Sequence, residues 1–182
     1  MIHKGTKCIE TGRLQLRPFR KEDAEAMFDN WAKDPEVTKF LSWQNYKSVD
    51  TAHAILEDWT AQYCRPDFYQ WAIELKELKQ PIGSISVVNA DDRVEMVEIG
   101  YCIGKAWWGQ GIMPEVLTAV VEYLFNEVGV QRVEAGHDPN NLASGAVIRK
   151  CGMKYEGTLR RRIRSNQGIT DVAWYSMLRE DR

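Results

Sequence analysis

The chain has 182 residues, of which 44% are hydrophobic and 27% are charged, and this length fits a single globular domain over residues 1–182. Its 24 basic and 26 acidic residues give a formal net charge of −2, so no overall positive charge would attract DNA or an anionic membrane. No apolar stretch approaches the ~20 residues that cross a bilayer, and residues 1–10 contain no signal-peptide core. We therefore expect a soluble protein of the reducing cytoplasm.

The spacing of cysteine and histidine indicates neither a metal site nor a catalytic thiol. The four cysteines are scattered, without a C-x-x-C pair or a histidine at ligand spacing, and the three histidines are isolated. Cys102 has no evident histidine or aspartate partner that could activate its thiol. We expect a functional site without metal.

The first third of the chain predicts one strand and two helices. Leu14–Arg17 has the pattern of a short strand. Apolar residues then recur at helical spacing over residues 24–31, until Pro35 stops the run. Ser48 can cap a second helix, whose apolar stripe covers residues 52–63.

The hydrophobic period changes from 3.6 to 2 in the middle of the chain. Residues 71–75, 82–88 and 94–103 alternate and have short connections, which is typical of an antiparallel meander. In the third run, one face carries Val97, Ile99, Tyr101 and Ile103, and the other carries Glu98, Gly100 and Cys102.

The longest apolar stripe predicts a helix over residues 113–128, which Gly129 ends. A strand at residues 132–135 and a helix that closes at Gly152 follow, and residues 155–160 and 170–177 form the last strand-like runs. We expect a mixed α/β (α+β) fold with helices around a central sheet.

Residues 104–113, before the long helix, form a glycine-containing loop. Gly109 and Gly111 allow backbone amides to approach an anion closely, and a helix N-terminus adds about half a positive charge. The loop is not a dinucleotide fingerprint, because Pro114 stands where the third glycine would fall, and it is not a Walker loop. Taken alone, this segment fits either a phosphate site or a simple tight turn.

Five segments in chain order carry a resemblance to a known family. They are Thr-Gly-Arg-Leu-Gln-Leu-Arg-Pro at 11–18, Glu-Ile-Gly-Tyr at 98–101, Trp-Trp-Gly-Gln-Gly at 107–111, residues 140–153, and Gly-Ile-Thr-Asp at 168–171. Together they resemble the GNAT superfamily of acyl-CoA N-acyltransferases, and most closely the RimJ/RimL type, the ribosomal-protein N-terminal acetyltransferases. The likeness covers nearly the whole chain.

This resemblance implies a mostly antiparallel sheet in which two strands splay apart and admit the pantetheine arm of acetyl-CoA, the acyl donor. Main-chain groups of residues 101–103 would pair with the arm, amides of residues 109–113 would hold the pyrophosphate, and Asn141 would meet the pantetheine. Arg149 and Lys150 are candidate partners for the 3′-phosphate. The implied cofactor-binding residues are Tyr101, Cys102, Ile103, Trp108, Gly109, Gln110, Gly111, Ile112, Met113, Asn141, Ser144 and Lys150.

The family likeness also suggests catalytic residues. Glu98 matches a glutamate that acts as general base in some relatives, although an exposed glutamate on a sheet face would look the same. Ser144 would lie near the thioester sulfur as a proton donor, unless it is only a small residue in a helical turn. The tyrosine that often serves as general acid is replaced by Ile148, so that role passes to Ser144, to another tyrosine or to water.

The sequence leaves the amine acceptor open. An α-amine with a reference pKa of ~7.7–8.0 costs only about 1–1.4 kcal/mol to neutralise at pH 7, against about 4.6 kcal/mol for lysine. We expect direct acetyl transfer in a ternary complex, with a protein N-terminus as acceptor and a monomer or homodimer as the active form. A small amine as acceptor, or a catalytically idle acyl-CoA sensor, are the alternatives.

Overall fold

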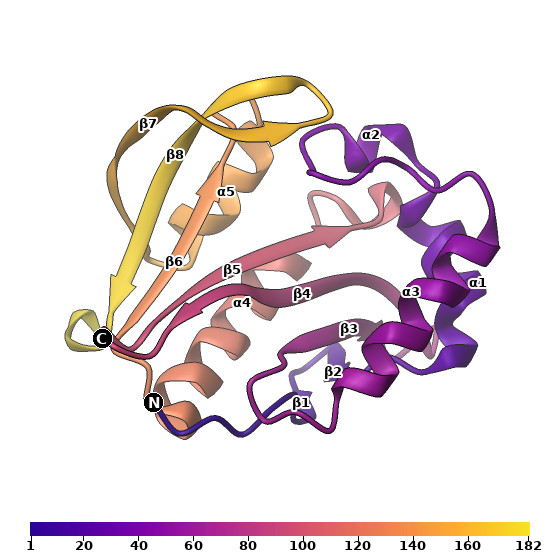
Figure 1. The fold of residues 1–182 in the computed structure, drawn as a ribbon, viewed down its shortest axis with the longest axis horizontal. Coiled ribbons are helices and arrows are strands. Elements are labelled where there is room, and N and C mark those ends of the chain that lie inside the picture. Colours follow the sequence, from indigo (N-terminus) through magenta and orange to yellow (C-terminus); the bar gives the residue numbers. More distant parts are fainter.

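The computed structural model describes residues 1–182, which form one eight-stranded sheet flanked by helices (Figure 1). The strand order is β1-β2-β3-β4-β5-β6-β8-β7. Neighbouring strands run antiparallel, except for the parallel pair β5 and β6. The strands are β1 Ile9–Glu10, β2 Leu14–Arg17, β3 Gln70–Leu75, β4 Gln80–Asp91, β5 Met96–Ile103, β6 Arg132–His137, β7 Lys154–Ser165 and β8 Gly168–Leu178.

Helices cover both faces of the sheet. In Figure 1, α4 and α5 lie behind the strands, whereas α1 and α3 lie in front of the end formed by β2, β3 and β4. None of the helices has the length and apolar composition that crossing a membrane requires. The helices are α1 Ala24–Met27, α2 Pro35–Thr38, α3 Val49–Gln62, α4 Ile112–Tyr123 and α5 Leu142–Lys150.

The larger apolar cluster lies between the sheet and α4. The helical stripe expected over residues 113–128 is buried, and it continues past α4 through the π-helical turn Leu124–Val128. Gly129, with a φ of 81°, ends this helix in the left-handed conformation that glycine adopts at little cost. A smaller cluster with Trp31 and Leu56 fills the space between α1, α3 and the other face of the sheet.

One local prediction is incomplete and another needs correction. The helical run ends before Pro35, as expected, but Pro35 also begins α2, where the side chain of Asp34 accepts a hydrogen bond from the Glu36 amide. Proline fits the first turn of a helix, which has no use for its missing N–H. Strand β7 is also longer than the alternating run at 155–160, and its pairing with β8 is interrupted between Leu159 and Ile163 by a bulge in which Arg161 has a φ of 50°.

Strands β5 and β6 pair over a short distance only. The parallel register contains Met96–Arg132, Val97–Val133 and Glu98–Glu134, and it ends there. Beyond this point β5 continues alongside β4 and β6 alongside β8, so the two strands diverge, as Figure 1 shows. The edge of β5 beyond Glu98 therefore has no strand partner on this side.

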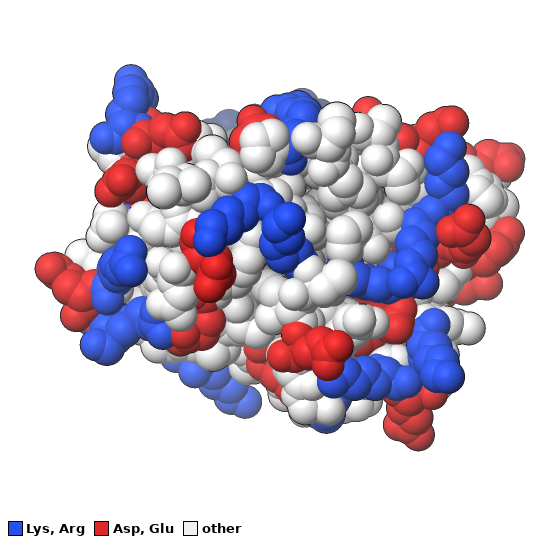
Figure 2. Space-filling model, turned by 90° about the horizontal axis from the view of Figure 1, so that it is seen from below, with Lys and Arg blue, Asp and Glu red and all other residues white.

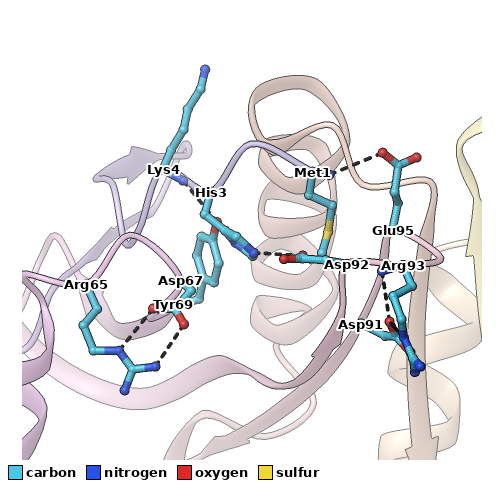
Figure 3. Close-up of polar contacts among 10 residues, drawn as sticks. All are labelled: Met1, His3, Lys4, Arg65, Asp67, Tyr69, Asp91, Asp92, Arg93 and Glu95. Atoms are coloured by element: carbon cyan, nitrogen blue, oxygen red, sulfur yellow. Dashed lines mark hydrogen bonds and ion pairs between the residues drawn. The ribbon is translucent and has the colours of Figure 1, made fainter.

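The first residues of the chain contact the end of the sheet that lies away from the divergence of β5 and β6. The two ring nitrogens of His3 lie 3.0 Å from the Tyr69 hydroxyl and 3.0 Å from an Asp92 carboxylate oxygen (Figure 3). The Met1 amine lies 3.3 Å from a Glu95 carboxylate oxygen. These contacts join the first residues to Tyr69, just before β3, and to the turn between β4 and β5, away from the point at which β5 and β6 diverge.

The surface carries both signs of charge in alternation. Figure 2 shows basic and acidic side chains interspersed over one face, without a large area of either sign. This distribution agrees with the net charge of −2.

Candidate functional site

A cavity of about 700 Å³ opens beside the end of β5, where it has left β6. Its walls come from residues 101–103 of β5, the loop before α4, the first turn of α4, helix α5 from its first to its last turn, and the segment 36–41. Of its 23 lining residues, 14 are hydrophobic. Such a space fits an elongated ligand with an apolar arm and a few polar contacts.

One end of this cavity can hold an anion. Gly109 and Gly111 have φ values of 74° and 71°, and Gly111 is the N-cap of α4 without a side chain that caps the helix. A Cβ at Gly109 would meet nothing within 4 Å, and one at Gly111 would meet only an Arg13 nitrogen at 3.9 Å. The first amides of α4 have no acceptor within the helix and lie at the cavity wall, and the helix dipole makes this end electropositive.

Arg13 supports the loop, although the sequence alone did not identify it as a site residue. Its guanidinium donates to the Gln110 carbonyl oxygen at 3.0 Å and to a Glu115 carboxylate oxygen at 2.7 Å. Glu115 stands in the first turn of α4, where its charge would repel a bound anion. Pairing with Arg13 offsets that charge and fixes the loop carbonyl.

The side chains of Trp108 and Gln110, both in the loop before α4, point in different directions. Trp108 lines the cavity and is 45% exposed, and its indole N–H donates to the Ile103 carbonyl oxygen at 2.9 Å. The Gln110 side chain donates to the Ala106 carbonyl oxygen at 2.9 Å and does not line the cavity. Gln110 can therefore contribute only main-chain groups.

The opposite wall is formed by α5. Asn141 caps this helix, and its side-chain oxygen accepts a hydrogen bond from the Ser144 amide at 3.3 Å. The Ser144 hydroxyl lies 3.0 Å from the Tyr101 hydroxyl, which also donates to the Ser144 carbonyl oxygen at 3.2 Å. Lys150 lines the cavity from the last turn of the same helix.

The surroundings of Ile148 and Cys102 indicate a structural role for both residues. Ile148 is fully buried within the larger apolar cluster, so this position faces the core rather than the cavity. The Cys102 thiol lies 3.5 Å from the Ser84 hydroxyl, and burial raises its pKa, which keeps it protonated.

Glu98 lies outside the cavity lining, on the sheet face opposite Tyr101. It stands beside Glu134 in the last parallel pair of β5 and β6, and Glu134 accepts a hydrogen bond from Arg132 at 2.6 Å. Burial and the Glu134 carboxylate raise the pKa of Glu98, and the Arg162 guanidinium opposes this increase. A carboxylate with a raised pKa, next to the point of divergence, is suited to accept a proton.

Comparisons with known proteins agree with this geometry. Residues 13–154 match the family model of the acetyltransferase (GNAT) domain. The chain is 33% identical over 171 residues to the N-acetyltransferase YoaA of Bacillus subtilis, covering 94% of this chain and 96% of that protein.

A characterised activity appears in the name of a more distant relative. The chain is 26% identical to the [ribosomal protein uS5]-alanine N-acetyltransferase of Escherichia coli, covering 82% of this chain and 79% of the relative. The fold is also that of RimL, the ribosomal L7/L12 alpha-N-protein acetyltransferase solved with coenzyme A, with a TM-score of 0.84, 21% identity, and coverage of 94% of this chain and 98% of RimL. The chain therefore belongs to the GNAT superfamily and is an N-acetyltransferase with relatives of the RimJ/RimL type.

Proposed function

We propose that this N-acetyltransferase uses acetyl-CoA as its donor and transfers the acetyl group directly to a protein N-terminal α-amine. The observation that carries the proposal is the cavity itself, which joins an electropositive helix N-terminus to the unpaired edge of β5. Coenzyme A was present in the solved structure of RimL. An acceptor of the ribosomal-protein type would place the enzyme in the cytoplasm.

The proposed donor fits the order of chemical groups along the cavity. Amides of residues 109–113 would hold the pyrophosphate, and Lys150 would neutralise the 3′-phosphate. The free edge of β5 at residues 101–103 offers main-chain groups to the two amides of pantetheine, in the manner of an added strand. Asn141 and Trp108 would border this arm.

The acceptor would approach from the face of the sheet that carries Glu98. The amine must lose a proton before it attacks, and an α-amine with a reference pKa of ~7.7–8.0 needs only a moderate base. Glu98, half-buried and with a raised pKa, is that base in our proposal, either directly or through one water. The E. coli relative named for an alanine of ribosomal protein uS5 supports an α-amine as the acceptor, because alanine has no side-chain amine.

Two measurements, made one after the other, test the proposal. Isothermal titration calorimetry with acetyl-CoA should give one site per chain. An assay of thiol release should then show turnover with peptides that carry a free N-terminal alanine or serine, but not with the same peptides after N-terminal blocking. Turnover of spermidine or amino sugars without turnover of any peptide would exclude the protein N-terminus. The absence of calorimetric heat would exclude acetyl-CoA as the donor.

A further inference from the structure

The hydroxyl groups of Tyr101 and Ser144 meet across the cavity, from β5 on one side and α5 on the other. Their oxygens are 3.0 Å apart, and the Tyr101 hydroxyl also reaches the Ser144 carbonyl oxygen at 3.2 Å. Both residues line the cavity, beyond the point at which β5 leaves β6. The contact thus joins two walls of the cavity that would receive the donor.

Tyr101 is the one tyrosine that lines this cavity. Other buried phenols bond elsewhere: Tyr63 donates to the Gln70 carbonyl oxygen and Tyr123 to the Gly5 carbonyl oxygen, each at 2.8 Å. Ile148 is enclosed in the core and offers no hydroxyl. Among the residues that line the cavity, Tyr101 therefore supplies the phenol that can act on a ligand there.

The pair can exist in two hydrogen-bonding states, because each hydroxyl has one proton. When Tyr101 donates to the Ser144 carbonyl, the Ser144 hydroxyl can donate back to the phenol oxygen. When Tyr101 donates to the Ser144 hydroxyl oxygen instead, the proton of Ser144 is free to point into the cavity. The second state presents a polarised donor to a ligand atom there.

We propose that Tyr101 is a positioning residue that directs the Ser144 hydroxyl toward the departing sulfur of CoA, an inference that rests on the proposed function. The amine nitrogen forms the C–N bond, and the C–S bond breaks with its electron pair moving to sulfur. Glu98 takes the amine proton and later releases it to water. The sulfur anion accepts a hydrogen bond from Ser144 and then takes one proton from water.

Tyr101 itself keeps its proton throughout this cycle. Burial raises the pKa of its phenol well above the usual value, and the Cys151 thiol nearby acts in the same direction, while the hydrogen bond to Ser144 opposes it. A CoA thiol resembles a cysteine thiol, with a reference pKa of ~8.5, so the phenol holds its proton more tightly than the thiol does. Its contribution is orientation and polarisation of the Ser144 hydroxyl.

The decisive measurement is the pKa of the CoA thiol while CoA is bound, followed by the ultraviolet absorbance of the thiolate as the pH rises. Tyr101→Phe and Ser144→Ala should each raise this pKa by about 1 relative to the wild type, the effect of one lost hydrogen bond to an anion. The double variant should raise it no further, because the two residues act through one contact. With the acceptor, Tyr101→Phe should lower kcat by about tenfold and leave KM for acetyl-CoA nearly unchanged.

Tyr123→Phe provides the matched control, because it removes a buried phenol that bonds Gly5 away from the cavity. This variant should keep the wild-type thiol pKa and kcat. If CoA binds to Tyr101→Phe and its thiol titrates as in the wild type, or if the effects of the two single variants add, the proposed pairing is wrong. Failure of the wild-type protein to bind CoA would instead contradict the proposed function. If Tyr101→Phe does not fold, an unchanged thiol pKa in Ser144→Ala contradicts the proposal, because Ser144 then donates no hydrogen bond to the sulfur.

Discussion

Gly111 shows how a single side chain can decide whether an anion binds. Its φ of 71° and the empty space above it leave the first amides of α4 open. A carboxylate at this position would stand where the proposed pyrophosphate binds. Two like charges about 4 Å apart repel by about 4 kcal/mol at an effective dielectric constant of about 20.

We therefore expect Gly111→Asp to weaken acetyl-CoA binding by at least tenfold, measured by calorimetry. Gly111→Asn is the matched control, since asparagine has nearly the same size and also tolerates positive φ. The asparagine variant should lose much less affinity. Equal losses in the two variants would mean that backbone strain, not charge, determines binding.

The Glu98–Glu134 pair gives a second prediction at this scale. Burial and Glu134 raise the pKa of Glu98, so kcat should rise with pH as Glu98 loses its proton. Glu134→Gln removes one of these causes and should move that rise in kcat to lower pH. Glu98→Gln should abolish the rise and lower kcat by about a hundredfold, within the usual range for a general base.

Glu156→Gln is the control for this prediction. Glu156 also pairs with Arg132, but it does not contribute to the raised pKa of Glu98. Its substitution should leave the pH profile of kcat in place. A profile that moves equally in the Glu134 and Glu156 variants would show that Arg132, rather than Glu134, controls the base.

At the scale of elements, the turn between β7 and β8 is fastened to the segment after α2. Asn166 in this turn donates from its side chain to the carbonyl oxygens of Thr38 at 2.8 Å and Trp43 at 2.7 Å, and from its amide to Leu41 at 3.0 Å. Residues 36–41 form one wall of the cavity. Figure 1 shows the turn lying beside α2. The C-terminal hairpin thus holds a wall that belongs to the N-terminal part of the chain.

Asn166→Ala removes the two side-chain hydrogen bonds, each worth about 0.5–1.5 kcal/mol. We expect faster hydrogen exchange in residues 36–43 and a higher KM for acetyl-CoA, with little change in global unfolding. Gln167→Ala, at the adjacent position, should have neither effect, because its side chain makes no hydrogen bond. Unchanged exchange in the Asn166 variant would show that packing alone holds the wall.

The elements differ in how well their sequences predict them. The core stripe of α4 and the glycine loop depend on local spacing, so they are visible in the sequence, and the structure confirms both. The length of β7 is not visible in the sequence, because its bulge interrupts the alternation that would reveal a strand. The GNAT resemblance predicted the splayed strands, which the fold confirms, whereas hydrophobic periodicity gives no sign of them.

The polar contacts of the candidate site were harder to foresee. Glu134 meets Glu98 through a parallel pairing, and Arg13 meets Glu115 over 102 positions of sequence. Such contacts depend on the tertiary arrangement and leave no local signal. The family resemblance implied a main-chain role for Tyr101, and the structure adds the contact of its hydroxyl with Ser144.

For the molecule as a whole, the short parallel pairing of β5 and β6 joins the two parts of the sheet. A ligand that lies along β5 and also contacts α5 would connect these parts. Acetyl-CoA at 100 times its Kd should therefore stabilise the protein by about 2.7 kcal/mol.

For a chain of this size, that stabilisation corresponds to a rise in Tm of roughly 5–11 °C, measurable by differential scanning calorimetry. Gly111→Asp at the same ligand concentration should show a much smaller rise. A similar rise in that variant would place the ligand elsewhere on the molecule.

The bulge in β7 has a consequence for the behaviour of the protein at high concentration. One edge strand of the sheet is β7. Its hydrogen-bond ladder with β8 is interrupted at three arginines, Arg160, Arg161 and Arg162. The opposite margin, β1, has only two residues. Neither edge strand offers a long, flat and uncharged edge with which a β-strand of another molecule could pair. Both edges therefore oppose the strand stacking that leads to fibrils.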